Sequence, residues 1–178
     1  DIVVTADPVR RIENAPSTTV TIDAERIATT INAVSIEDTL KYAPSLIIRK
    51  RSIGDNFAPI ATRTSGLGSS ARSLIFADGV PLSALIANNN GNGSPKWQLV
   101  SPEEVAKIDV LYGPFSAAYA GNSIGTVVNI TTRLPDKLEA QATLLFNNQW
   151  HTQYTTRLSL PTGQASASIG DRFGRFAF

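Results

Sequence analysis

Few side chains in this sequence can carry out covalent chemistry. His151 is the only histidine, and cysteine is absent. Without cysteine there can be no disulfide, thiol nucleophile, zinc–thiolate site or iron–sulfur ligand set. A Ser-His-Asp triad would depend on His151, which lies outside the compact region predicted for residues 8–134. We therefore predict no enzymatic function, no catalytic residue, no metal site and no cofactor.

Polar side chains that could hold a ligand are concentrated in two stretches. Residues 49–51, RKR, follow an apolar run at 46–48, a position typical of a solvated strand end. Residues 88–94, NNNGNGS, cannot bury enough apolar surface to fold alone and are predicted to form an exposed loop. Trp97 follows this loop, and the sequence leaves two interpretations of it, a core anchor or a contact residue.

Composition and charge narrow the class of protein. The 178 residues are 42% hydrophobic and 17% charged, which is typical of one globular domain with an appendage. Sixteen Lys and Arg oppose fifteen Asp and Glu, and no basic run of the kind that follows a phosphate backbone is present. We therefore expect no nucleic-acid partner. No apolar run approaches the roughly 18 residues that a membrane helix requires.

The elements that position the loops can be predicted from local signals. Three helix starts are indicated by an N-cap residue with an acidic side chain in the first turn, namely Asp23, Ser35 and Ser101. Strands are predicted at 19–22, 46–48, 74–76, 106–111 and 124–131, with an Asp-Gly hairpin turn at 78–79. A small-residue helix is predicted from Gly113 to Gly121. Strands and helices with short joints favour a compact α+β domain that ends near Arg133.

Beyond Pro135 the pattern changes to strict alternation. At 138–146 every second residue is apolar, and similar alternation returns at 154–160 and more weakly at 165–169. Such strands are polar on one face and compatible with lipid on the other. Trp150, Tyr154 and Phe173 lie near the segment ends, where the aromatic girdle of a membrane barrel is found. A water-exposed antiparallel meander has the same period, so periodicity alone leaves both alternatives open.

The segment 103–133, EEVAKIDVLYGPFSAAYAGNSIGTVVNITTR, resembles the closing segment of plug domains in TonB-dependent outer-membrane receptors. Residues 36–46, IEDTLKYAPSL, resemble the family's helix ending in Pro-Gly-Val, and residues 74–82, LIFADGVPL, resemble its Leu-Ile-Asp-Gly-Val-Pro turn. Residues 1–6, DIVVTA, resemble the Ton box. These motifs occur in the family's order over nearly all of residues 1–133.

The sequence departs from the family pattern at several positions. Ser45 replaces a glycine after proline, and Ala120 and Thr126 replace two more glycines. Arg63 stands within Arg-Thr-Ser-Gly where Ile-Arg-Gly is usual, and Tyr112 takes the place of an arginine before Gly-Pro. In the family these arginines face acidic residues of the barrel wall, so the resemblance implies a plug–barrel contact at Arg63 and none of that kind at Tyr112.

The resemblance implies a three-part organisation: a Ton box at 1–7, a plug domain at 8–134, and an incomplete start of a transmembrane β-barrel at 135–178. The expected fold class is α+β, with a small mixed β-sheet and short helices followed by the first antiparallel barrel strands. The implied function is to gate energy-coupled uptake of a scarce nutrient, foremost a ferric-siderophore complex, in the outer membrane of a Gram-negative bacterium. Iron would arrive already chelated, because no metal site is visible.

The resemblance also implies partners and site residues. TonB would bind the Ton box as an added β-strand, through Asp1, Ile2, Val3, Val4, Thr5 and Ala6. The plug would contact its own barrel, which is missing here. A small-molecule ligand, expected to be a metal chelate, would meet two plug loops at 51–57 and 84–97. The expected ligand-binding residues in these loops are Arg51, Asn56, Phe57, Asn88, Asn89, Asn90, Asn92 and Trp97.

The length of the C-terminal segment limits what it can form. The 45 residues after Arg133 (178 − 133) suffice for three or four membrane strands of about 9 to 11 residues each. We expect a fragment of a longer receptor, with residues 137–178 disordered, loosely paired or associating between molecules. Alternative functions are a stand-alone periplasmic or surface binding module, a signalling receptor with a domain before the Ton box, or a receptor for cobalamin, haem or oligosaccharide.

Overall fold

The computed structural model describes residues 18–55, 57–66, 72–83, 94–113, 119 and 123–178. Its centre is a five-stranded mixed sheet with the strand order β1-β6-β7-β4-β5. The strands are β1 (Thr19–Asp23), β4 (Leu74–Ala77), β5 (Val80–Pro81), β6 (Val105–Tyr112) and β7 (Thr126–Thr132). All neighbouring pairs are antiparallel except β4 and β7. This small mixed sheet, together with the short helices described below, confirms the predicted α+β class.

The predicted Asp-Gly turn joins β4 to β5. Asp78 and Gly79 both have positive φ, 47° and 81°, which is the conformation of a two-residue hairpin turn. The Asp78 carboxylate accepts hydrogen bonds from the backbone N–H and the hydroxyl of Thr132, at 3.0 and 2.6 Å. The turn is therefore attached to the end of β7 and fixes the edge hairpin on the sheet.

All three predicted N-caps begin helical turns. These are α2 (Ala24–Thr30) and the 3-10 helices η1 (Ile36–Leu40) and η4 (Pro102–Glu104), while η3 (Trp97–Leu99) is a further 3-10 helix. Asp23 accepts a hydrogen bond from the backbone N–H of Arg26 at 2.7 Å. Ser35 and Ser101 both form capping boxes with the acidic residue three positions later. The 3-10 helix η4 is short because β6 begins directly after it, at Val105.

The core lies between these helices and one face of the sheet. Ile108 and Val110 of β6, and Val128 and Ile130 of β7, point into it and are fully buried. Side chains of opposite parity, Leu74, Leu111 and Val127, form a second small cluster on the other face. Burial on both faces of the sheet explains the adjacent apolar residues at 110–111 and 127–128.

A two-stranded ribbon lies beside this sheet. It pairs β2 (Ile47–Ile48) with β3 (Ile60–Ala61) in antiparallel register. The predicted strand at 46–48 therefore contributes only two paired residues. The segment between β2 and β3, residues 49–59, contains the first of the two predicted ligand loops.

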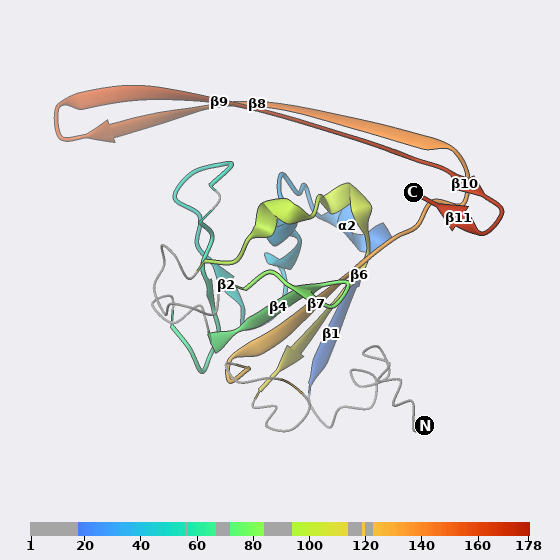
Figure 1. Cartoon of the computed structure of the whole chain (residues 1–178). Coiled ribbons are helices and arrows are strands. Elements are labelled where there is room, and N and C mark those ends of the chain that lie inside the picture. The colour runs from blue at the N-terminus through green and yellow to red at the C-terminus, as the bar shows by residue number, and fades with distance from the viewer. Residues whose placement is uncertain (1–17, 56, 67–71, 84–93, 114–118, 120–122) are drawn as a thin grey trace.

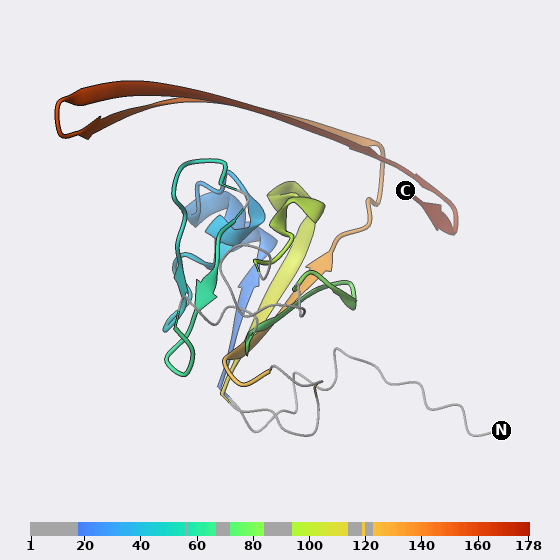
Figure 2. The same ribbon diagram turned by 60° about the vertical axis from the view of Figure 1, so that its left-hand side comes forward.

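The C-terminal segment forms a long hairpin of β8 (Glu139–Gln153) and β9 (Thr156–Gly170), followed by β10 (Arg172–Phe173) and β11 (Phe176–Ala177). The pairing runs without interruption from Glu139 opposite Gly170 to Gln153 opposite Thr156. Figures 1 and 2 show it crossing the helices on the side away from the sheet. Among the described residues, no helix is both long and apolar enough to cross a membrane.

This hairpin corrects the expectation that residues 137–178 are disordered or loosely paired. From Ala140 to Phe146 and from Gly163 to Ile169, the two strands pair in a register that puts their polar residues on one face, and this face contacts the globular part through Thr143 and Gln164. The segments at 154–160 and 165–169 form one continuous strand through Pro161. Proline is tolerated there because β9 has a partner on one side only, so the missing N–H can fall on the open edge.

Candidate functional site

The loop from Arg51 to Phe57 is the predicted ligand-binding segment that the structure describes most fully. Its base is closed by the β2–β3 pair and by a hydrogen bond from the Arg49 N–H to the Pro59 carbonyl, at 3.2 Å. Gly54 turns the chain with a φ of 78°. Because both ends are fixed by the ribbon, the loop leaves the domain at a defined place, beside the hairpin.

Asp55 organises this loop. Its carboxylate accepts hydrogen bonds from the backbone N–H groups of Arg51 and Phe57, both at 2.9 Å, and from Nε and Nη2 of Arg51, at 3.0 and 2.9 Å. The side chain is only 4% exposed. The hydrogen bond from the Arg51 guanidinium, together with the two backbone N–H groups, holds the pKa of Asp55 well below its usual value despite burial.

Arg51 and Phe57 lie together in the structure. The guanidinium carbon of Arg51 is 5.2 Å from the centroid of the Phe57 ring, a cation–π distance. The Arg51 side chain is 68% exposed, and Phe57 is also exposed. Asp55 was not among the predicted site residues, although its acidic side chain four positions after Arg51 is a local signal for the pair.

Lys50 attaches the base of the loop to η1. Its ammonium lies 3.0 Å from Oε1 of Glu37 and 2.7 Å from Oδ1 of Asp38, and it donates a hydrogen bond to the Ser35 hydroxyl. Burial alone would raise the pKa of Asp38, but the hydrogen bonds and charge of Lys50 lower it overall. In the triplet at 49–51, Lys50 is therefore a structural anchor, whereas Arg51 faces outward.

The structure corrects the ligand-contact interpretation of Trp97. This side chain is 2% exposed, and its indole Nε1–H donates a hydrogen bond to the Ala58 carbonyl at 2.9 Å. Trp97 is therefore a core anchor that fixes the chain directly after Phe57. Asn56, Asn88, Asn89, Asn90 and Asn92 lie outside the described residues, and so do Asp1, Ile2, Val3, Val4, Thr5 and Ala6.

A small cleft of about 140 Å³ separates the loop from the hairpin, with Gly54, Asp55 and Trp97 on one side and Gln164 on the other. Across it, Nε2 of Gln164 donates a hydrogen bond to the Val34 carbonyl at 3.1 Å. This hydrogen bond joins β9 to the segment before η1, and the loop residue Gly54 lines the same cleft.

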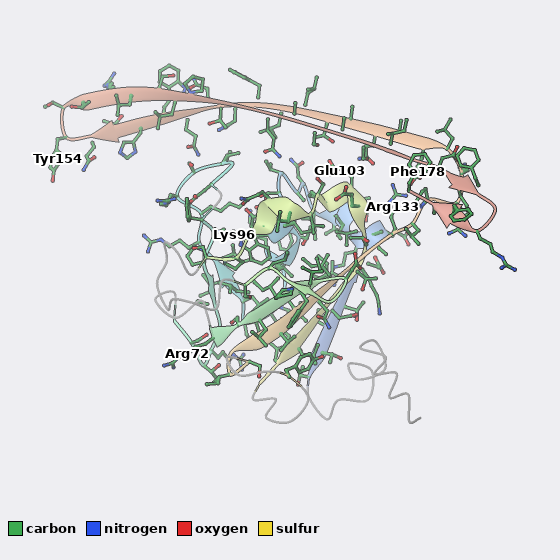
Figure 3. The ribbon with its side chains drawn as sticks, in the orientation of Figure 1. Arg72, Lys96, Glu103, Arg133, Tyr154 and Phe178 are labelled. Atoms are coloured by element: carbon green, nitrogen blue, oxygen red, sulfur yellow. The ribbon has the colours of Figure 1, made fainter. Side chains whose placement is uncertain are left out.

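A second polar contact joins the domain to the hairpin near its start. Arg133 pairs with Glu139 and donates from Nε to the Glu103 carbonyl at 3.0 Å. The Thr143 hydroxyl of β8 donates to the Glu103 carboxylate at 2.7 Å. Figure 3 shows Glu103 and Arg133 on the side of the domain that faces the hairpin. The contacts between the two parts are therefore hydrogen bonds and an ion pair.

The other face of the hairpin is apolar and points away from the domain. Phe146 is 77% exposed and Tyr154, at the hairpin's free end, is 94% exposed. The exposed apolar residues of this face include Leu144, Phe146, Trp150 and Ile169. This sidedness is opposite to that of a water-exposed hairpin packed on a core.

Arg63 lies at the far end of the sheet and is exposed. It lines a hollow of about 380 Å³ together with Ser45, Tyr112 and Gly125. Burial raises the pKa of Tyr112. A contact between Arg63 and a barrel wall stays a prediction.

Comparison with known proteins gives a consistent family assignment. The family described as TonB-dependent Receptor Plug Domain matches residues 11–127. The chain is 39% identical over 82 residues to the ferric enterobactin receptor PirA of Pseudomonas aeruginosa, covering 42% of this chain and 11% of that protein. It is 24% identical over 160 residues to the vitamin B12 transporter BtuB of Vibrio vulnificus, covering 89% of this chain and 25% of that protein.

Solved structures agree on the fold. The unliganded ferric citrate transporter FecA superimposes with a TM-score of 0.68 and 19% identity, covering 98% of this chain and 26% of that chain. The chain thus spans only 11% to 25% of the two curated relatives named above.

Proposed function

Because this chain belongs to the TonB-dependent receptor plug family, we propose that it gates energy-coupled uptake of a scarce nutrient, a ferric-siderophore complex, across an outer membrane. The observation that carries the proposal is the sidedness of the hairpin, which is polar toward the domain and apolar away from it. A wall strand between lipid and a hydrated lumen has this pattern. The function is transport rather than catalysis.

The division into parts follows from this proposal. Residues 1–7 act as the Ton box, residues 8–134 as the plug, and residues 135–178 as the first strands of a barrel supplied by the rest of the receptor. Polar contacts such as that between Thr143 and Glu103 suit a plug that must move, because they can be exchanged for contacts with water without exposing a large apolar area. The partner that supplies the energy is TonB, which binds the Ton box from the periplasm.

The outer membrane of a Gram-negative bacterium is the proposed location. Relatives support it by name, including an iron-regulated outer membrane virulence protein of Vibrio cholerae with 29% identity over 134 residues. The ferric enterobactin receptor among the relatives supports iron chelates as the substrate. Cobalamin is the second candidate, because the similarity to a vitamin B12 transporter extends over 89% of this chain.

The proposal can be tested by uptake into cells. The complete receptor would be expressed in a Gram-negative strain that lacks its own siderophore and cobalamin receptors. Radioactive iron supplied as siderophore complexes, and radioactive cobalamin in parallel, would then be followed with and without TonB. We expect iron uptake that requires TonB. Cobalamin uptake without iron uptake would show that cobalamin is the substrate. The absence of TonB-dependent uptake of both compounds would refute the transport function.

A further inference from the structure

We propose that the cleft between the globular part and the hairpin binds one hydrated divalent cation of the Mg²⁺ kind, which joins Glu37 of η1 to Gln164 and Ser166 of β9. The inference goes beyond the proposed function and does not depend on it. It follows from three features of the cleft: a buried carboxylate oxygen without a partner, an excess of negative charge, and neutral oxygen atoms on the opposite wall.

Glu37 has one carboxylate oxygen that no described residue satisfies. Its side chain is 1% exposed, and the residue lines the cleft. Oε1 lies 3.0 Å from the Lys50 ammonium, whereas Oε2 is buried and has no hydrogen-bond partner among the described residues. A buried charged oxygen without a donor or a cation is costly, because it has lost its water and gained nothing in return. An additional group is therefore required at Oε2.

Lys50 cannot supply this group. An ammonium has three donors, and those of Lys50 have three acceptors, namely Oε1 of Glu37, Oδ1 of Asp38 and the Ser35 hydroxyl. Lys50 also brings one positive charge to two carboxylates. The cluster of Glu37, Asp38 and Lys50 therefore keeps a net negative charge next to the cleft.

The other charged groups around the cleft add to this excess. Asp55 is paired with Arg51. Glu103 also lines the cleft, and Arg133 binds its backbone carbonyl but pairs with the Glu139 carboxylate. Four carboxylates at the cleft therefore have two cationic partners, and no lysine or arginine is among the described residues that line it. A field of this sign attracts cations, and a divalent cation more strongly than a monovalent one.

The opposite wall of the cleft offers neutral oxygen atoms. Gln164 donates its amide N–H to the Val34 carbonyl, which leaves its amide oxygen, and Ser166 adds a hydroxyl to the lining of the cleft. These two residues lie on the same face of β9 because they are two positions apart. Carboxylate, amide and water oxygens are the ligands that hard divalent cations take. An ion at Oε2 of Glu37 would thus link the globular part to the hairpin.

The ion must keep most of its water. No group of three or more acidic or histidine side chains that could hold a metal ion is found in the part of the chain that the structure describes. Mg²⁺ commonly keeps several waters and binds through roughly one or two carboxylates, whereas Ca²⁺ takes about six to eight oxygen ligands. The cleft of about 140 Å³ has room for a hydrated ion, since one water needs only about 10–15 Å³. The sequence predicted no metal site because these oxygen atoms meet only on folding.

The test measures ion binding by the complete receptor, purified in a non-ionic detergent and freed of metal with a chelator. The probe is Mn²⁺, which replaces Mg²⁺ and is detected by electron paramagnetic resonance. We expect a class of bound Mn²⁺ that Mg²⁺ displaces and an equal concentration of Na⁺ does not. Glu37→Gln keeps the shape of the side chain but removes its charge, and should weaken this binding about tenfold. Glu25→Gln is the matched control, because Glu25 is exposed and does not line the cleft.

A second pair of variants tests the hairpin side and leaves the buried cluster intact. Ser166→Ala should weaken Mn²⁺ binding about threefold, whereas Ser168→Ala, on the same face of β9 but outside the cleft, should not. A receptor without Mn²⁺ that Mg²⁺ displaces would overturn the site. Equal Mn²⁺ affinity in wild type and Glu37→Gln would show an adventitious ion only and would also overturn it. Binding that depends on Glu37 but yields equally to Na⁺ would overturn the divalent assignment. None of these outcomes bears on the uptake experiment that tests the proposed function.

Discussion

Ser45 has a φ of 60° directly after Pro44. In this left-handed region a side chain with a β-carbon is disfavoured by about 1–2 kcal/mol, whereas glycine adopts it freely. The resemblance to plug domains predicts a glycine here, and the structure keeps the glycine-like backbone although the residue has changed. A strained residue is thus located at the turn between η1 and β2, where it lines the same hollow as Arg63.

We therefore expect Ser45→Gly to stabilise the protein. Relief of the strain is partly offset by the greater freedom of glycine in the unfolded chain, so the expected gain is about 0.5–1 kcal/mol. The free energy of unfolding from urea titration measures it. Ser52→Gly is the control, because Ser52 is not among the described residues with positive φ, and it should destabilise. A loss of stability in Ser45→Gly would show that the strain is not significant.

Asp55 should make stability depend on pH. The hydrogen bond from Arg51 lowers the pKa of Asp55 in the folded protein below its ordinary value, so the folded state binds fewer protons than the unfolded state at acidic pH. Its stabilising contribution is therefore complete above the unfolded pKa and is lost as pH falls through the folded pKa. We expect the difference in unfolding free energy between wild type and Asp55→Asn to be constant from neutral pH to about pH 5 and to shrink below about pH 4. A difference that stays unchanged at still lower pH would contradict this assignment.

At the scale of elements, the sequence predicts what depends on near neighbours. The caps at Asp23, Ser35 and Ser101 are confirmed because a cap needs only residues within about four positions. The helix after Ser35 is a 3-10 helix, and the strand at 46–48 shrinks to two residues, because both are set by packing against distant segments. Element types were therefore more predictable than their extents.

The candidate site also combines features set by near neighbours with features set by distant residues. Arg51 and Phe57 were predicted from the loop's position in the motif order. The burial of Trp97 depends on Ala58, 39 residues earlier in the chain, and no local pattern decides it. The ion pair between Asp55 and Arg51 has a local signal, because the two residues are four positions apart. The rule that pairs such residues applies to helices, however, and this loop is not helical.

An element-scale prediction concerns residues 1–7, the proposed Ton box. If the segment adds a β-strand to TonB, its backbone N–H groups must be donors, and proline removes one of them. A peptide with Val3→Pro should therefore lose binding to the C-terminal domain of TonB in a titration. Val3→Thr keeps both the N–H and the β-branched shape and should bind like wild type. Unchanged affinity of the proline peptide would rule out strand addition centred on Val3.

At the scale of the whole molecule, the chain has two unlike surfaces. The globular part buries its apolar side chains, whereas the hairpin exposes a row of them on the face away from it. An exposed apolar surface of this kind is typical of contact with lipid or another protein. Periodicity predicted the two-faced strands, but only the structure shows which face is turned toward the globular part, because a shift of one residue would exchange the faces.

This surface can be followed through the two tryptophans, since Trp97 is buried and Trp150 is exposed on the apolar face. Adding detergent micelles should move Trp150 into an apolar environment and shift the fluorescence emission to shorter wavelength. Trp150→Phe should abolish the shift, and Trp97→Phe should leave it. A shift that persists without Trp150 would mean that detergent unfolds the core rather than covering the hairpin.

The pairing of β1 with β6 has a consequence for the timing of folding. Thr19 lies opposite Leu111, 92 positions later (111 − 19), and β4 pairs with β7 across a separation of 53 (127 − 74). Such distant contacts form slowly, because much chain entropy is lost before any of them is gained. During synthesis the sheet cannot close until Thr132 has emerged. When the chain is synthesised, β1 therefore exists long before its partner β6, and the core between them is completed late.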